Sequence, residues 1–170
     1  MAILRGQRGG NDCGPTCFAN ALNILGYDIK ISQANELCNL AKDGTDGQDL
    51  TKAFNKYGFN CKEKIHYSPK RAWDWLIRDT NRGLPIIIGV DNGTHWLLVL
   101  RAGRQEAQIL DPESDNPNKV SKEKLLHRWK YIEDGLIRPK YEGLKIAPFK
   151  NKSIKAVLLR KKILATIDVK

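Results

Sequence analysis

Residues 7–26 read Gln7-Arg-Gly-Gly-Asn-Asp-Cys13-Gly-Pro-Thr-Cys17-Phe-Ala-Asn-Ala-Leu-Asn-Ile-Leu-Gly26, so that a glycine-rich loop gives way to an apolar segment. The segment has the periodicity of an amphipathic helix over about residues 13–25, because its apolar side chains share one face: Phe18, Ala21, Leu22 and Leu25. Asp12 is suited to capping the start of this helix, and Gly26 is suited to ending it. The shared apolar face places the helix in the core.

Cys13 is the first candidate for chemistry, because it stands where the loop meets the helix. The unpaired amides and the dipole at a helix start favour a thiolate over a thiol. A cysteine placed there, with Gln7 upstream and a candidate His-Asp pair downstream, indicates a cysteine hydrolase. Cys13 and Cys17 could share a metal, but without two further spaced ligands the zinc signal is weak. Cys17, Cys38 and Cys61 are expected to be structural.

The chain has 170 residues, of which 41% are hydrophobic and 28% charged, an ordinary globular balance. We expect a single domain over residues 1–170, with a helical part at about 1–82 and a sheet part at about 83–170. No apolar run approaches the roughly 20 residues that span a bilayer, and no signal-peptide pattern opens the chain. Four cysteines without such a signal indicate reduced thiols in the cytoplasm.

The net charge of +10 is concentrated near the end of the chain. From Lys140 to Lys170 there are nine Lys or Arg residues and two acids, which leaves a net +7. A solvated basic surface is one interpretation; an anionic partner, such as an acidic protein, nucleic acid or lipid head groups, is the other. Because no base-stacking motif or helix-turn-helix pattern is present, nucleic acid is not the expected partner.

The order of predicted elements is that of an α+β protein in which helices come first and an antiparallel sheet follows. Further helices are expected at about residues 32–40, 48–57, 69–82 and 122–130, the first of them capped by Ser32. Strands are expected at about residues 84–90, 95–100, 105–110 and 154–159. The first three of these strands form a meander with turns at residues 91–94 and 102–104.

The hairpin around Gly103 predicts that His95 and Asp111 meet. If the strands pair symmetrically about position 103, these two residues lie directly opposite each other, with Cβ atoms about 4.5–5.5 Å apart. This register needs an odd-length loop; a two-residue turn at residues 103–104 would place Pro112 opposite His95, and a one-residue bulge would also change the pairing. His95 begins its strand and Asp111 ends its own, so both lie at one edge of the sheet.

Four ordered features resemble the papain-like cysteine peptidases of the bacteriocin-processing, double-glycine-leader type. They run over about residues 5–130. They are Gln7 followed by Asn11-Asp12-Cys13-Gly14 and a helix ending in Leu25-Gly26-Tyr27, then Gly83-Leu84-Pro85-Ile86-Ile87, then His95-Trp96-Leu97-Leu98-Val99-Leu100, and last Ile109-Leu110-Asp111-Pro112 with Trp129 in the helix after it. No membrane segment and no Gly-x-x-x-x-Gly-Lys-Ser/Thr motif follows, so a role in export is not implied.

The resemblance implies a papain-like fold and a role for each matching residue. Cys13 would be the nucleophile, His95 its general base and later acid, and Asp111 the group that orients the imidazole. Gln7 would donate to the oxyanion beside the Cys13 amide. The implied reaction is hydrolysis of a peptide bond after a small residue such as glycine in a peptide or protein substrate, with no cofactor or metal.

Other interpretations remain open for each residue and for the whole chain. Cys13 could be a buried helix residue, His95 a structural strand residue, Asp111 the start of a turn with Pro112, and Gln7 an ordinary loop residue. The same residues could serve acyl transfer or deamidation instead of hydrolysis, or the fold could be a non-catalytic binding module. His66 and His127 are expected to be exposed, and Trp73, Trp75 and Trp96 are expected in the core.

Overall fold

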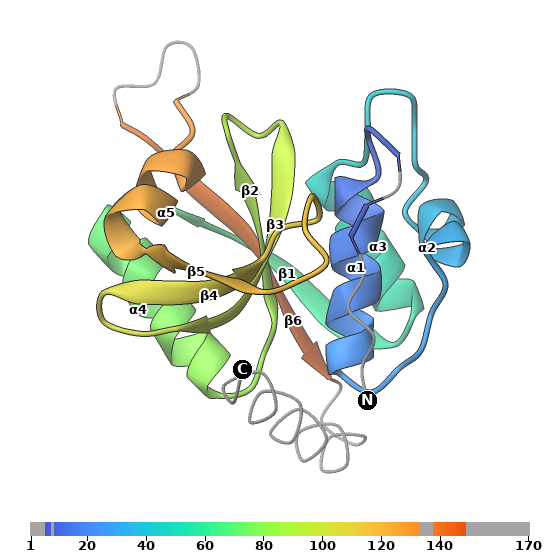
Figure 1. Ribbon diagram of the computed structural model, residues 1–170, viewed down its shortest axis with the longest axis horizontal. Helices are drawn as coiled ribbons and strands as arrows, with labels where there is room; N and C mark the ends of the chain where they lie inside the picture. Colours follow the sequence, from blue (N-terminus) through green and yellow to red (C-terminus); the bar gives the residue numbers. More distant parts are fainter. Residues whose placement is uncertain (1–5, 8, 133–137, 149–170) are drawn as a thin grey trace.

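The computed structural model describes residues 6–7, 9–132 and 138–148. Its centre is one six-stranded antiparallel sheet with the strand order β1-β6-β2-β3-β4-β5 (Figure 1). The helices are α1 (Cys13–Ile24), α2 (Ile31–Leu37), α3 (Gly47–Lys56), α4 (Pro69–Asn81) and α5 (Lys122–Trp129). The strands are β1 (Phe59–His66), β2 (Ile86–Val90), β3 (His95–Ala102), β4 (Glu106–Leu110), β5 (Asn118–Ser121) and β6 (Tyr141–Pro148).

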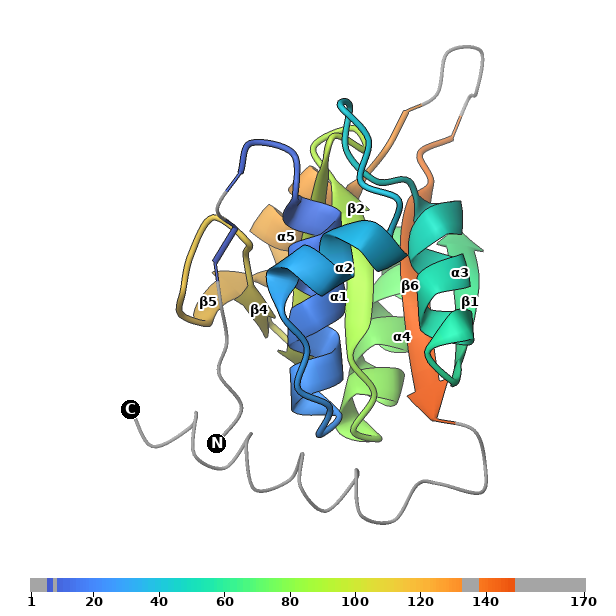
Figure 2. The same ribbon diagram turned by 90° about the vertical axis from the view of Figure 1, so that its right-hand side faces the viewer.

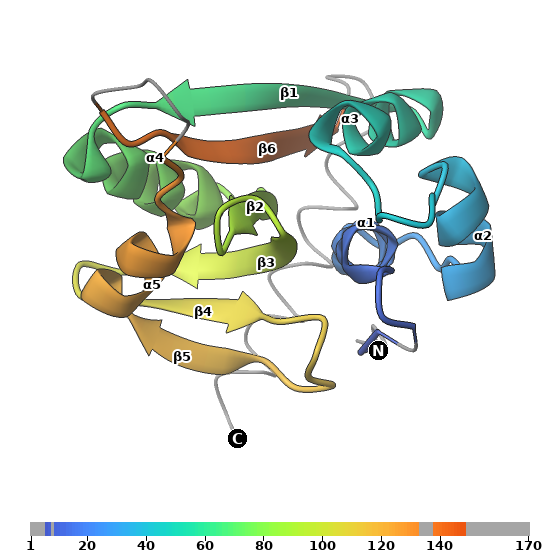
Figure 3. The ribbon, with the colours of Figure 1, turned by 90° about the horizontal axis from the view of Figure 1, so that it is seen from above.

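The sheet separates two apolar cores, because side chains of successive strand residues point to opposite faces. On one face, Leu98 and Leu144 pack with α1, α2 and α3. On the other face, Leu97 and Val99 pack with α4 and α5. Seen from above, the two groups of helices lie on opposite sides of the strands (Figure 3). α2 packs on α1, and α3 packs on β1 (Figure 2).

Helix α1 has the predicted position but not the predicted cap. At its end, the Gly26 amide donates to the Asn23 carbonyl and the Tyr27 amide to the Leu22 carbonyl, and Gly26 has φ +91°. This pair of bonds is the Schellman motif, which favours glycine at that position. At its start, the Asp12 side chain makes no capping bond and instead accepts from the Gly9 amide at 3.2 Å. The expected Asp12 cap is therefore wrong, because its carboxylate folds back to close the glycine loop.

The other predicted helices are present with small differences at their ends. The second helix begins at Ile31 and not after Ser32: the Gln33 side chain accepts from the Lys30 amide at 3.2 Å, so that the cap is Lys30, two residues earlier than expected. The strands β2, β3 and β4 confirm the meander. The predicted strand at 154–159 lies outside the described residues.

Three strands were not predicted from the sequence: β1, β5 and β6. β1 is an edge strand whose middle residues are exposed and charged, so that it lacks the apolar alternation of a half-buried strand. β5 is the opposite edge strand, with only four residues. β6 lies in the basic part of the chain, and its burial does not alternate strictly, because the successive residues Gly143 and Leu144 are both buried. Because β1 belongs to the sheet, the helical part at 1–82 and the sheet part at 83–170 are interleaved rather than separate.

The predicted register of the β3–β4 hairpin is wrong. Ala102 pairs with Ala107, and after a bulge between Val99 and Arg101, Leu98 pairs with Leu110. Gly103 donates to the Glu106 carbonyl at 2.8 Å, so the chain turns at residues 104–105 instead of around position 103. His95 is consequently not the cross-strand partner of Asp111; it pairs with Val90 on β2.

Candidate active site

His95 and Asp111 are hydrogen-bonded despite the different register. His95 Nε2 lies 2.8 Å from Asp111 Oδ1. Pairing between β3 and β4 begins at Leu98 and Leu110, so His95 extends three residues beyond the hairpin and Asp111 begins the loop after it. A turn closed by the Ser114 amide and the Asp111 carbonyl follows at once. The two side chains therefore meet at the end of the sheet, beyond the last paired residues of β3 and β4.

The electrostatics of this pair favour an ion pair at neutral pH. The side chains of His95 and Asp111 are 13% and 14% exposed. Hydrogen bonds to Asp111 and to Cys13 raise the pKa of His95 to about 10, although burial opposes this. Burial alone would raise the pKa of Asp111, but hydrogen bonds from His95 and the Glu113 amide, with the charges of His95 and Arg128, leave it below its ordinary value.

Cys13 approaches the same imidazole from α1, which lies on the sheet face opposite to α4 and α5. It is the first residue of α1 and only 8% exposed. Because His95 Nε2 is taken by Asp111, Nδ1 is the ring nitrogen left for the thiol. Gly14 allows this close approach: a Cβ there would lie 3.1 Å from Thr45 Cβ and 3.3 Å from Trp96 Cδ1. The indole of Trp96 in turn donates to the Thr45 carbonyl at 2.8 Å.

Gln7 is tied to the loop that carries Asp111. Its backbone amide donates to the Pro112 carbonyl at 2.5 Å, and the neighbouring Gly6 amide donates to Asp115 Oδ1 at 2.7 Å. The side-chain oxygen Oε1 of Gln7 is buried with no hydrogen-bond partner among the described residues. The structure thus places the glycine loop before α1 against the loop after β4.

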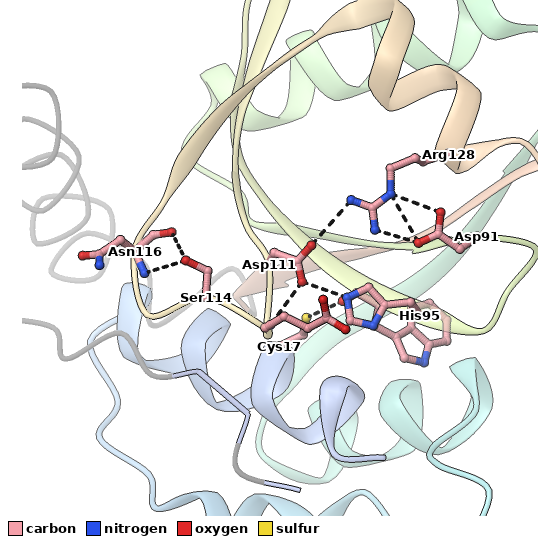
Figure 4. A network of polar contacts seen from close by, with 9 residues as sticks. Cys17, Asp91, His95, Asp111, Ser114, Asn116 and Arg128 are labelled. Carbon is pink, nitrogen blue, oxygen red and sulfur yellow. Dashed lines mark hydrogen bonds and ion pairs between the residues drawn. The ribbon is translucent and has the colours of Figure 1, made fainter. Parts of the chain in front are cut away.

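Sequence reasoning missed two charged residues beside Asp111, namely Arg128 and Asp91. Arg128 Nη1 lies 3.5 Å from Asp111 Oδ2, and Arg128 Nη2 lies 2.6 Å from Asp91 Oδ2 (Figure 4). Arg128 is at the end of α5, whereas Asp91 is in the turn before His95. No periodicity in the sequence relates positions 37 residues apart, so only the packing of α5 against β2 brings them together.

The remaining cysteines and histidines have structural surroundings. All four cysteines are free thiols. Burial raises the pKa of Cys17, and raises that of Cys38 and of Cys61 to about 12. Among the described residues, no group of three or more His, Cys, Asp or Glu side chains could hold a metal ion. His127 is exposed as expected, but His66 is half-buried and packs against Trp75 with ring centroids 5.2 Å apart.

Two open cavities flank the start of α1. One, of about 520 Å³, is lined by Thr45 and Trp96, which pack on Gly14, and by carboxylates at Asp43, Asp46 and Glu142. The other, of about 860 Å³, is lined by the loop of residues 9–12 together with Lys30 and Lys42. The first cavity thus includes Trp96, the chain neighbour of His95, and the second includes Asp12, the chain neighbour of Cys13.

Comparisons with known proteins agree with this architecture. The profile of the peptidase C39 family matches residues 4–133. The lactococcin-G-processing and transport ATP-binding protein LagD of Lactococcus lactis subsp. lactis is 28% identical over 120 residues, which cover 69% of this chain and 16% of LagD. The chain thus spans about a sixth of this curated relative.

Two solved structures show the same fold. The peptidase domain of Streptococcus ComA, a bi-functional ABC transporter, has a TM-score of 0.67 and 22% identity, covering 88% of this chain and 100% of that domain. A double glycine motif protease from an AMS/PCAT transporter, solved with its leader peptide, has a TM-score of 0.67 and 19% identity, covering 86% and 91%. The papain-like, α+β architecture is therefore shown. Across the described residues, no helix has the length and apolar character needed to cross a membrane.

Proposed function

The chain belongs to the peptidase C39 family, and from this premise we propose that it cleaves a peptide bond after a small residue such as glycine, with Cys13 as nucleophile. It is a cysteine peptidase with the papain-like fold. The substrate class proposed is a peptide or protein with a double-glycine leader, because one structural relative is a double glycine motif protease solved with its leader peptide. The observation that carries the proposal is the hydrogen bonding of His95 to both Asp111 and Cys13.

Each residue has a defined part in the proposed reaction. The Cys13 thiolate attacks the carbonyl carbon, and the resulting oxyanion collapses to a thioester as the C–N bond breaks. Protonated His95 gives its proton to the leaving amine and then takes a proton from the attacking water, which releases the acid and restores the thiolate. The hydrogen bond to Asp111 holds the ring with Nδ1 toward the sulfur.

The oxyanion needs donors that are in place before the reaction. As the first residue of α1, Cys13 has an amide without an intrahelical acceptor, so this N–H is available to the oxyanion. Gln7 is proposed as the second donor. Its backbone bond to Pro112 holds it beside the loop that carries Asp111.

A peptide-library cleavage screen read by mass spectrometry tests the proposal. We expect hydrolysis products that end in glycine or another small residue, and Cys13→Ala should lower turnover by on the order of 10⁴-fold or more while the fold is kept. Products joined to an added amine would indicate transfer, and a gain of one mass unit without cleavage would indicate deamidation. Binding without any product in the wild type would indicate a non-catalytic module. Turnover retained by Cys13→Ala would remove Cys13 as the nucleophile.

Alkylation offers a test that needs no substrate. Iodoacetamide at near-neutral pH should label Cys13 well before the other thiols, because burial raises the pKa of Cys17, Cys38 and Cys61 and a protonated His95 stands beside Cys13. Peptide mapping by mass spectrometry gives the order of labelling. Equal labelling of all four thiols in the folded protein would contradict an activated Cys13.

We also propose a cytoplasmic setting and an anionic partner for the basic end. Four free thiols are compatible with a reducing compartment. Lys140 and Lys145 lie near Glu142 and Asp79, at 3.8 and 3.1 Å, so the proposed partner would use the basic residues after position 148. Sedimentation with phosphatidylserine vesicles, compared between wild type and Lys161→Glu/Lys162→Glu, would test this part. Equal sedimentation of the two proteins would contradict it.

A further inference from the structure

Arg128 joins three parts of the molecule that meet at the candidate active site. Its carbonyl accepts from the Asp91 amide at 2.8 Å, and its Nε and Nη2 lie 3.1 and 2.6 Å from the two carboxylate oxygens of Asp91. Asp91 and Asn92 have φ of +54° and +58°, and the Gly93 amide donates to the Val90 carbonyl, which makes a tight turn immediately before His95. The end of α5 is thus fastened to the turn that leads into His95.

The third nitrogen of the same guanidinium faces Asp111. The two carboxylate oxygens of Asp111 have different partners: Oδ1 accepts from His95 Nε2 at 2.8 Å and from the Glu113 amide at 3.1 Å, whereas Oδ2 faces Arg128 Nη1 at 3.5 Å. Rotation of the carboxylate would break both sets of contacts at once. Figure 4 shows Arg128 between Asp91 and Asp111, and His95 facing the other oxygen of the Asp111 carboxylate.

We propose that Arg128 is a positioning residue for the proposed hydrolysis, which holds the Asp111 carboxylate in the orientation that aims His95 at Cys13, and that Asp91 holds Arg128 in place. The proposal rests on the function proposed above, because Arg128 acts only through Asp111. It adds a fifth and a sixth residue to the site, beside Cys13, His95, Asp111 and Gln7, from elements that the resemblance to known peptidases did not bring forward.

The charge of Arg128 is constant over the pH range in which the site would work. Its pKa is raised, first by the hydrogen bond to Asp91. The groups that face Asp111 are His95 from β3, Arg128 from α5, the Glu113 amide from its own loop, and the Cys17 thiol from α1. Arg128 is the one permanent cation in this set. Its removal would therefore make the Asp111 carboxylate harder to form and weaken its hold on the His95 ring.

If the role of Arg128 were purely structural, its loss would affect stability and not the chemistry. Through Asp91, Arg128 also fastens α5 to the sheet, so its loss could lower stability without touching the chemistry. A structural role alone would leave the pH profile of the remaining folded enzyme unchanged. Asp91→Asn separates the two roles, because asparagine tolerates positive φ and keeps the turn while the charged clamp on Arg128 is lost.

The test compares Arg128→Gln, Arg128→Lys and Asp91→Asn with the matched control Lys119→Gln, which breaks an ion pair to Glu106 with both side chains more than half exposed. The readouts are kcat and KM on a double-glycine peptide and the rate of Cys13 alkylation by iodoacetamide as a function of pH. For Arg128→Gln we expect roughly tenfold lower kcat, the effect of losing one charge-assisted contact, with KM unchanged. In the pH profiles of kcat and of Cys13 alkylation, the fall toward acid pH should begin at a higher pH than in the wild type.

The other variants should lower kcat by smaller amounts or not at all. Arg128→Lys should keep the wild-type acid limb but lose part of kcat, because the charge remains and the planar fork does not. Asp91→Asn should lower kcat less than Arg128→Gln, and Lys119→Gln should match the wild type. Unchanged kcat and pH profile in folded Arg128→Gln would overturn the proposal, as would a loss confined to stability. If Arg128→Gln does not fold, a wild-type kcat in both Arg128→Lys and Asp91→Asn would overturn it.

Failure of this inference can be told apart from failure of the proposed function. If wild type cleaves no peptide, the proposed function fails, but the alkylation profile still reports whether Arg128 acts on Cys13 through Asp111 and His95. If wild type cleaves and Cys13→Ala does not, the proposed function stands whatever Arg128→Gln does.

Discussion

Asp79 and Asp111 are both largely buried carboxylates with basic neighbours, but the regions in which they lie have different roles. Asp79, near the end of α4, has no exposed side-chain surface and lies 3.1 Å from Lys145 Nζ and 3.2 Å from Arg78 Nε. Asp111 keeps some exposure and has a histidine as its nearest base. In both, burial opposes ionisation and basic neighbours outweigh it, so the pKa is lowered.

The difference lies in the partners. Lysine and arginine side chains are ordinarily cationic at neutral pH, so the Asp79 cluster links α4 and β6 through fixed charges. Histidine can lose its proton and give it to a reacting group. A buried ion pair with fixed charges therefore serves the fold, whereas one with a titratable partner next to a thiol can serve chemistry.

The largest expected effect separates the two carboxylates by activity. Asp111→Ala should lower kcat by on the order of 10³-fold, because the imidazole loses the group that orients it, while Asp111→Asn should lose only about tenfold, since an amide oxygen can accept the same bond, as the asparagine of papain-like enzymes does. Asp79→Asn should leave kcat near wild type. Steady-state kinetics on one double-glycine peptide measure all three. A similar kcat for Asp111→Ala and Asp79→Asn would erase the distinction.

The Asp79 cluster, which should matter little for kcat, should matter for stability. Lys145→Met leaves one oxygen of a fully buried Asp79 without its cation, and we expect a loss of about 1–3 kcal/mol in the free energy of unfolding. Arg82→Met should cost less, because this arginine is largely exposed and 3.7 Å from the carboxylate. Urea denaturation followed by circular dichroism measures both. Equal losses would mean that burial of the cation does not matter here.

A further expected effect is a slope of stability with pH. His95 has its pKa raised from about 6.5 in the unfolded chain to about 10, so its contribution is complete below pH 6.5 and is lost as the pH rises toward 10. The slope is at most about 1.4 kcal/mol per pH unit. The lowered pKa values of Asp79 and Asp111 act on the acid side, where their contribution is lost as the pH falls below about 4.

Urea titrations between pH 6 and 10 check this slope, and His95→Gln should flatten it. Lys145→Met should keep it, because the slope arises from His95, which this substitution leaves in place. A wild-type protein whose unfolding free energy is flat from pH 6.5 to 10 would contradict a protonated His95 in the folded state.

Much of the fold could be predicted from local patterns in the sequence. α3 and α4 have a strong helical period, whereas α1 is buried on all sides but has a clear end at Gly26 with its positive φ. The strands β2 and β3 are continuous apolar runs around a turn of Asp91, Asn92 and Gly93. β1 was missed because an exposed edge strand takes its stability from pairing with β6, and its charged residues carry no sign of that partner.

The predicted contact between His95 and Asp111 is present, but the strand register from which it was predicted is wrong. The sequence suggested a directly opposed pair, whereas a turn at 104–105 and a bulge at the middle of β3 shift the register. The side chains meet because one strand begins and the other ends at the same edge of the sheet. A register depends on turn geometry and on single inserted residues, which the identities of the two strands do not determine.

By itself, the sequence determined which residues could do chemistry and where the regular elements lie, because helix ends, strand runs and turns are set by neighbours within a few positions. Only the tertiary structure decided what surrounds each of those residues. It placed the start of α1 beside His95, turned Asp111 toward the ring, and brought Arg128 from α5 and Asp91 from the β2–β3 turn behind the carboxylate. These groups come from distant parts of the chain and meet only when both faces of the sheet are packed, so no local pattern can encode their distances or their charges.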